Sequence, residues 1–131
     1  MIINLTQHPA SADQLAVGVI DLAGDHLASL KAALTFGALP DAQGIRDRAD
    51  HVAELACMSG LGGDGDDPFP TRAMIGGALW LMAPLAEALR VRSIEPLFAF
   101  SVRETEEQKQ ADGSVRKIAV FRHAGFVPAV A

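Results

Sequence analysis

The sequence predicts a small three-layer α/β domain with a mostly parallel sheet and an antiparallel C-terminal hairpin strand. Short apolar segments alternate with segments of helical periodicity, which is the pattern of β-α-β units. The segment IEPLFAFS, at 94–101, is a nearly continuous apolar run, as expected of a central parallel strand. Asp112-Gly113 then separates this segment from another strand-like one and favours a hairpin. The 131 residues suit one domain spanning 1–131.

The first half of the chain predicts two short strands and three helices. Pro9 marks a boundary between the first strand and a loop, because the residue before a proline, here His8, avoids the helical region of backbone conformations. Ser11 is a favourable N-cap, and Pro40 ends one helical run before the next begins. The expected elements are strands at 2–5 and 17–22, and helices at 11–16, 26–34 and from 41 onward.

The segment RAMIGGALWLMAPLAEALRVRS, at 72–93, allows two interpretations: one kinked helix, or a strand that turns into a helix. In a single long helix Pro84 would lose a backbone hydrogen bond and clash with the carbonyl four residues earlier, at a cost of about 3 kcal/mol. If the helix begins near 79–81, Pro84 falls in or near its first turn, where a proline is tolerated. Gly76-Gly77 then forms the tight turn. The sequence favours strand–turn–helix.

The C-terminal part predicts a hairpin with a charged connection. Its first strand ends at Ser101, a polar excursion follows over 103–110, and basic and apolar residues alternate in the returning strand over 115–121. This topology places His123 at the opposite end of the sheet from Ser101, which favours a structural role for the histidine.

Composition and charge exclude several classes of function. The net charge of −5 argues against binding to long nucleic acid. The chain lacks an apolar run of 18 residues and a signal peptide, so we expect neither a membrane span nor export. Cys57 is the only cysteine, which fits a reducing cytoplasm. The Gly- and Asp-rich stretch 58–70 lacks the spacing of a calcium loop, so we expect an exposed loop and no metal or cofactor.

The carboxyl ends of the strands are the expected ligand site, because open α/β sheets bind ligands there. A glycine turn before a helix can direct backbone N–H groups at a phosphate, while arginine and serine add side-chain hydrogen bonds. The candidates are Thr6, Gln7 and His8 after the first strand, Asp21 after the second, Gly76 and Gly77 after the third, and Ser101, Arg103 and Glu104 after the fourth.

Each candidate also has an interpretation without a ligand. Gly76-Gly77 matches neither a GxGxxG fingerprint nor a Walker A loop, so a bare turn is at least as well supported. Ser101 and Arg103 are also typical of a strand-end serine beside a solvated arginine that pairs with a nearby glutamate. His8 has the chemistry of an acid or base near neutral pH, but its place before a proline favours a loop residue.

Three motifs carry a resemblance: INLTQHP at 3–9, AFSVRE at 99–104 and DGSVRKIAVFRHAGF at 112–126. In this order they resemble small stand-alone CRISPR-associated proteins with a Rossmann-like nucleotide-sensing fold, which are related to CARF domains and the ring nucleases. The resemblance covers most of the chain in layout and a minor part of it by motif.

The resemblance implies that the protein binds a cyclic oligoadenylate second messenger across a two-fold homodimer, in CRISPR antiviral signalling. For some members it also implies cleavage without metal, by attack of a ribose 2′-hydroxyl on the adjacent phosphate. It implies phosphate contacts for the catalytic candidates Ser101 and Arg103, ligand contacts for Gly76, Gly77 and Glu104, and a pocket lined by Thr6, Gln7 and His8.

Two other functions fit the same sequence. One is a non-enzymatic nucleotide sensor on the same fold, which binds the ligand without cleaving it. The other is a small α/β interaction protein, in which the apolar Trp80, Leu81 and Met82 would mark a partner surface. Core packing is the better interpretation of Leu81, and Trp80 suits either role.

Overall fold

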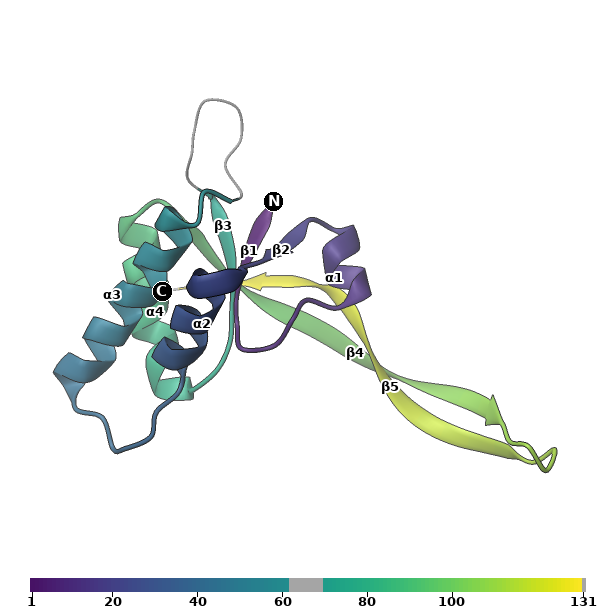
Figure 1. Cartoon of the computed structure of the whole chain (residues 1–131). Helices are drawn as coiled ribbons and strands as arrows, with labels where there is room; N and C mark the ends of the chain where they lie inside the picture. Colours follow the sequence, from purple (N-terminus) through teal and green to yellow (C-terminus); the bar gives the residue numbers. More distant parts are fainter. Residues whose placement is uncertain (62–69, 131) are drawn as a thin grey trace.

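The structure, a computed structural model, describes residues 1–61 and 70–130. It has one five-stranded sheet with the strand order β2-β1-β3-β4-β5 (Figure 1). The first four strands are parallel, and β5 pairs antiparallel with β4, so the predicted fold class is confirmed. The elements are β1 (Ile2–Leu5), α1 (Ala12–Ala16), β2 (Val19–Asp21), α2 (Gly24–Leu34), α3 (Ala42–Met58), β3 (Arg72–Ile75), α4 (Leu79–Val91), β4 (Glu95–Lys109) and β5 (Val115–Pro128).

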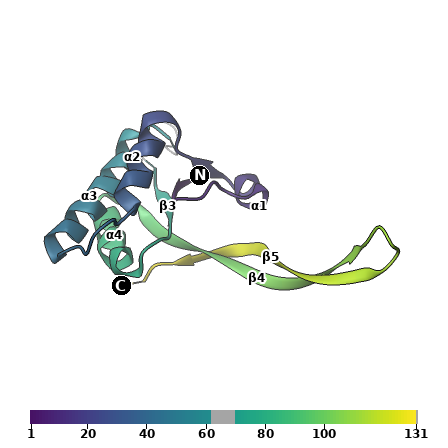
Figure 2. The same cartoon turned by 60° about the horizontal axis from the view of Figure 1, so that its bottom comes forward.

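The two faces of the sheet are covered unequally. Helices α2, α3 and α4 pack together on one face, and the short α1 lies on the other (Figures 1 and 2). Ile3, Leu5 and Ile75 belong to the larger core beneath the three helices. The opposite face holds a small cluster of four buried side chains: Ile2, Val19, Met74 and Leu97. Most of the burial that stabilises the fold therefore lies on the side of α2–α4.

The segment 72–93 forms a strand, a glycine turn and a helix, as predicted. Gly77 has a φ of 137°, a conformation that other residues rarely adopt, and α4 begins two residues later. Pro84 is the sixth residue of α4, so it lies one turn deeper than the predicted first turn. Its ring removes the hydrogen bond to the carbonyl of Trp80, four residues earlier. Leu81 is fully buried, while Trp80 is half exposed and packs edge-on against Phe36.

The hairpin is longer than predicted, and two expectations about it are wrong. The residues 103–110 do not form a loose excursion, because β4 continues as a strand to Lys109. Residues 101–123 form a two-stranded ribbon, here called the arm, that extends away from the helices (Figures 1 and 2). Polar side chains are tolerated in this ribbon because both of its faces are largely open to water. The Asp112-Gly113 turn closes the tip of the arm, as predicted.

The second error concerns His123, which is the direct cross-strand partner of Ser101 and not at the far end of the sheet. The cause is the length of β5, whose pairing with β4 continues to Pro128, so His123 lies in the middle of the strand. A β-bulge between Phe100 and Ser101 leaves Ala124 without a partner at the base of the arm.

Three remaining expectations concern segment ends, loops and membranes. The second strand is shorter than expected, at Val19–Asp21. Most of the acidic stretch falls on residues 62–69, outside the described residues. Within the described part of the chain, none of the helices has both the length and the apolar character needed to cross a membrane.

Candidate ligand site at the carboxyl ends of the strands

A hollow of about 420 Å³ lies where β1 and β3 end. The chain leaves β1 toward β2 on one side and later returns to β3 on the other, so the strand order reverses at this point. Such a switch point is the usual ligand site of an open α/β sheet, and the volume lies within the ordinary range for small-molecule sites. The described residues that line the hollow are Thr6, Gln7, His8, Pro9, Gln14, Met74, Ile75, Gly76, Gly77, Phe98 and Ala99.

The loop after β1 is held in place by Asn4, the buried polar residue of the sheet. Its amide nitrogen donates to the carbonyl of His8 at 2.8 Å. Its oxygen accepts from the backbone N–H and the hydroxyl of Thr6, at 2.9 and 2.7 Å. The residues that form one wall of the hollow therefore take a fixed path back over the strand end. The signal in the sequence was an asparagine in the otherwise apolar strand IINL, and Asn4 was not among the predicted site residues.

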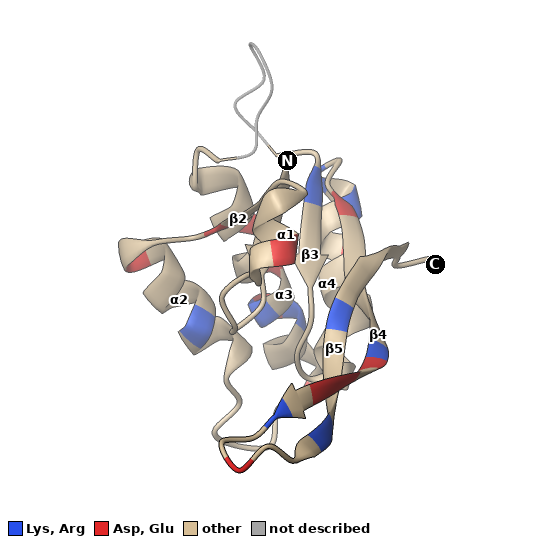
Figure 3. Cartoon of the chain, turned by 90° about the vertical axis from the view of Figure 1, so that its right-hand side faces the viewer, with Lys and Arg blue, Asp and Glu red and all other residues tan. Residues whose placement is uncertain are grey.

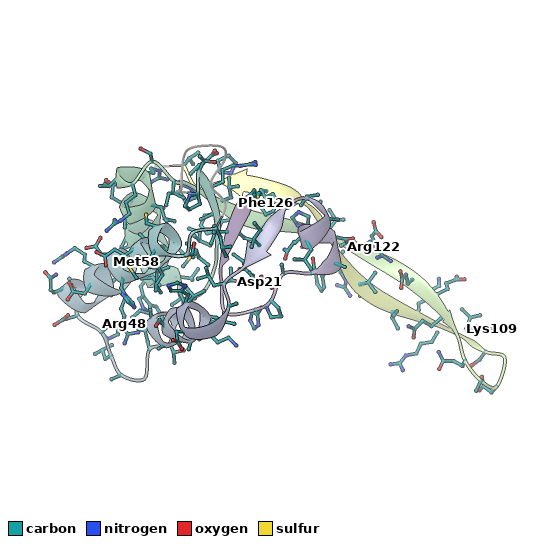
Figure 4. The ribbon with its side chains drawn as sticks, turned by 45° about the horizontal axis from the view of Figure 1, so that its top comes forward. Asp21, Arg48, Met58, Lys109, Arg122 and Phe126 are labelled. Carbon is teal, nitrogen blue, oxygen red and sulfur yellow. The ribbon has the colours of Figure 1, made fainter. Side chains whose placement is uncertain are left out.

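Asp21, labelled in Figure 4, ties this loop to the neighbouring strand β2. Its Oδ1 accepts from the amide of Asn4 at 2.8 Å and from the backbone N–H of Ala10 at 3.1 Å. Asp21 was predicted among the strand-end residues, but it does not line the hollow. It acts by positioning Asn4 and the chain that enters α1.

The opposite wall is the glycine turn that leads into α4. A side chain at Gly76 would meet the methyl group of Thr6 at 3.4 Å, so the two walls approach each other closely here. The N-cap residue of α4 is Ala78, which offers no side-chain hydrogen bond to the helix. The first N–H groups of this 13-residue helix are therefore free of a side-chain cap and carry the positive end of the helix dipole.

The lining of the hollow is mainly neutral. Among the described lining residues His8 is the only titratable one, and it is exposed. Gln7 donates to the hydroxyl of Thr35 at 3.1 Å, and the hydroxyl of Thr6 is engaged by the Asn4 loop. Backbone N–H groups at the glycine turn and the exposed imidazole of His8 are thus the groups best placed to meet a ligand.

The structure separates the other three candidates from this hollow. Ala99 lines the hollow, and Ser101 follows on β4 about 7 Å farther along the strand, with Arg103 about 7 Å beyond it. Both side chains are exposed. Glu104 is also exposed and accepts a hydrogen bond from Arg122 at 3.0 Å. The predicted site therefore divides into a hollow with five candidates and an arm with three.

A second, shallower depression of about 660 Å³ lies between α1 and the base of the arm. Glu104, Arg122 and His123 line it. The Nδ1 atom of His123 is buried, has no hydrogen-bond partner among the described residues, and the ring packs on Phe126 with centroids 4.7 Å apart.

Other reactive groups lie away from the hollow. Burial raises the pKa of the Cys57 thiol, so this cysteine in α3 stays protonated at neutral pH. Over the described ranges, 1–61 and 70–130, His, Cys, Asp and Glu side chains do not cluster in threes as a metal site would require.

These observations define a doubly wound α/β protein with a ligand-sized hollow at its switch point and a protruding β-ribbon. The model of the Uncharacterized protein MJ1673 family matches residues 1–127, and the chain belongs to this family. No curated protein and no solved structure gives a significant match to the chain.

Proposed function

We propose that the hollow between β1 and β3 binds a phosphate group of a nucleotide, and that this nucleotide is a cyclic oligoadenylate. The observation that carries the proposal is the glycine turn at the hollow, which leads into a helix without a side-chain cap. Free N–H groups at a helix start, together with the dipole, attract a phosphate. The apolar part of the lining, Met74 and Phe98, offers a surface for an adenine ring.

The choice of a cyclic oligoadenylate rests on the resemblance of the three sequence motifs to CARF-related proteins. The messenger would act in CRISPR antiviral signalling, and the single cysteine agrees with a cytoplasmic location. A ring of several nucleotides is larger than one nucleotide site, so one phosphate would enter the hollow and the rest would extend along β4 toward the arm. Ser101 and Arg103 lie in that direction and would contact phosphates there.

Cleavage is the further step of this proposal. In it the ribose 2′-hydroxyl gives its proton to solvent and attacks the adjacent phosphorus. The bond to the 5′-oxygen breaks, this oxygen takes a proton from solvent, and a cyclic 2′,3′-phosphate remains. The protein's part would be to hold these atoms in line and to stabilise the added negative charge, which suits the guanidinium of Arg103. If Arg103 stays in solvent when the ligand is bound, the protein acts as a sensor without turnover.

Ligand binding is tested by thermal shift and calorimetry with cyclic tetra- and hexa-adenylate, with linear oligoadenylate as the comparison. We expect Gly76→Val to lower the affinity at least tenfold, because its methyl groups enter the hollow where the walls are closest. Gly37→Val is the matched control, since an added Cβ at Gly37 meets no atom within 4 Å. Wild-type protein that binds none of these ligands would exclude the proposed function.

Cleavage is tested separately, by incubation of the same rings with the protein and a metal chelator. We expect linear products with a cyclic 2′,3′-phosphate end, and their loss in Arg103→Ala with binding retained. Binding without products in the wild type would establish the sensor alternative instead.

A further inference from the structure

The arm exposes a surface that the rest of the chain does not cover. The arm has nine cross-strand residue pairs, from Ser101–His123 to Lys109–Val115. Along this part of β4 the other neighbouring strand, β3, is absent, because β3 pairs only with the beginning of β4. Phe121 is 75% exposed and Val115 is 58% exposed. An isolated two-stranded ribbon is only marginally stable in water, so an arm of this length with open apolar side chains is typical of an element that packs against a partner.

Cross-strand pairing fixes which side chains share each face of the arm. One face carries Val102, Glu104 and Glu106 opposite Arg122, Val120 and Ile118, and Arg122 forms ion pairs with both glutamates across it. The other face, here called the open face, carries the most exposed aromatic side chain of the arm. Its five levels are Ser101–His123, Arg103–Phe121, Thr105–Ala119, Glu107–Lys117 and Lys109–Val115.

The charges on the arm indicate which partner would fit. Both signs are interspersed along it (Figure 3), with five cationic and four anionic side chains between residues 101 and 123. Such a balance does not suit nucleic acid or an anionic membrane, which require a dominant positive charge. It suits a surface that is complementary to itself, as a two-fold interface requires.

The open face is complementary to itself around one level, that of Thr105 and Ala119. Consider a two-fold axis at this level that runs between two ribbons, parallel to their faces and perpendicular to their strands. It stacks the open faces of two arms on each other, with the tips of the arms in opposite directions. Arg103 then meets Glu107 of the partner subunit, and Phe121 meets Lys117 of the partner subunit, each contact occurring twice. The small side chains at the axis allow the ribbons to approach closely. The two bodies then lie at opposite ends of the paired arms.

We propose that the open face of the arm docks on the same face of a second copy of this chain, in this antiparallel arrangement. Residues at equal distances from the axis lie at the same level, so Lys109 reaches the level of Ser101 of the partner subunit. Figure 4 labels Lys109 far out on the arm, away from the chain's own helices. Ser101 lies about 7 Å from the hollow's rim at Ala99, so each arm brings an ammonium group toward the other copy's hollow. The role of this ammonium group rests on the proposed function, because a positive charge near the hollow strengthens binding only of an anionic ligand.

Charge reversal tests the dimer without any ligand. Arg103→Glu and Glu107→Lys each place like charges in contact twice, so each variant alone should dissociate at least tenfold more readily in sedimentation velocity. In an equimolar mixture opposite charges face each other again, and native mass spectrometry should show the heterodimer. This rescue cannot arise within one chain. Lys31→Glu, a matched reversal on α2, should leave the dimer intact.

Three results would overturn the docking proposal: a monomeric wild-type protein, unchanged dimers in both variants, or a mixture that stays monomeric while circular dichroism shows both variants folded. Lys109→Gln separates the approach of Lys109 to the other copy's hollow from the formation of the dimer. It should leave the dimer intact and lower the affinity for a cyclic oligoadenylate about tenfold. Dimerisation with no binding by the wild type would refute the proposed function and leave the docking surface established.

Discussion

The body of the protein and its arm are stabilised in different ways. In the body, Leu5, Leu81 and Leu85 are fully buried between the sheet and the helices. In the arm the two strands pack mainly on each other, and their side chains are half or fully exposed. A change in the body therefore acts on the whole fold, while a change in the arm acts on one ribbon and on what that ribbon binds.

The largest contrast is expected from removing apolar groups. Leu85→Ala in α4 should lower the free energy of unfolding by about 2–5 kcal/mol, because the side chain is fully buried and leaves a cavity. Val115→Ala in the arm should change the free energy of unfolding of the monomer by less than about 0.5 kcal/mol, because the side chain is 58% exposed there. Urea denaturation of both variants measures the difference. Equal losses would show that the arm folds as part of the body.

The next contrast concerns buried polar groups. Asn4→Ala should cost about 1–3 kcal/mol, because it removes partners from Thr6, His8 and Asp21 at a buried position. Gln43→Ala is the matched control, an exposed amide whose bonds are to neighbours on the same helix. Because Asn4 fixes the wall of the hollow, its loss should also weaken ligand binding. Full affinity in a folded Asn4→Ala protein would contradict that positioning role.

A smaller effect is expected at the tip of the arm. Gly113 has a φ of 88°, so Gly113→Ala should strain the turn by about 1–2 kcal/mol. Amide hydrogen exchange should accelerate in the arm and stay unchanged in α3 and α4. Gly37→Ala, at a position without a positive φ and with open space around it, serves as the control. Faster exchange throughout the body would show that the arm and the body unfold together.

The smallest effect is a local dependence on pH. The hydroxyl and backbone N–H of Ser114 donate to Asp112 and hold the pKa of its carboxyl below the ordinary value of 3.8. The ionised form is favoured in the folded turn, so its contribution is complete above pH 3.8 and is lost as the pH falls through the lowered pKa. The amide resonance of Ser114 should follow this titration by NMR. Asp112→Asn should abolish it, and a titration at or above 3.8 would refute the assignment.

The pattern of apolar segments was enough to predict the body. Its strands alternate with helices, and the cost of Pro84 in a long helix located the glycine turn correctly. The hollow followed, because parallel strands place their carboxyl ends at one edge and so bring His8 and Gly76 together. The positioning role of Asn4 could not be predicted in this way, since a single polar residue in an apolar strand does not indicate which groups it will bond.

The arm was mispredicted because its sequence lacks the usual signal of a strand. The run from Arg103 to Lys109 is polar, and period-two patterning is lost where both faces of a ribbon meet water. The apolar side chains of this ribbon lie on the returning strand, where Val120 and Ile118 face Glu104 and Glu106. The sequence of β4 alone therefore does not show that it continues as a strand. The same error put His123 at the wrong end of the sheet and led to the prediction that a strand ends at Ser101.

The alternation of side chains between the two faces sets a parity rule for the length of the arm beyond the unpaired Ala124. Adding two residues to each strand beyond this point would lengthen the ribbon and keep every side chain on its present side. Adding one to each would turn the outer portion over, so that Lys117 and Glu107 exchanged sides with Ile118 and Glu106. Insertions in natural variants of the arm should therefore come in even numbers per strand, while the residues that line the hollow, which lie before the irregularity, keep their places.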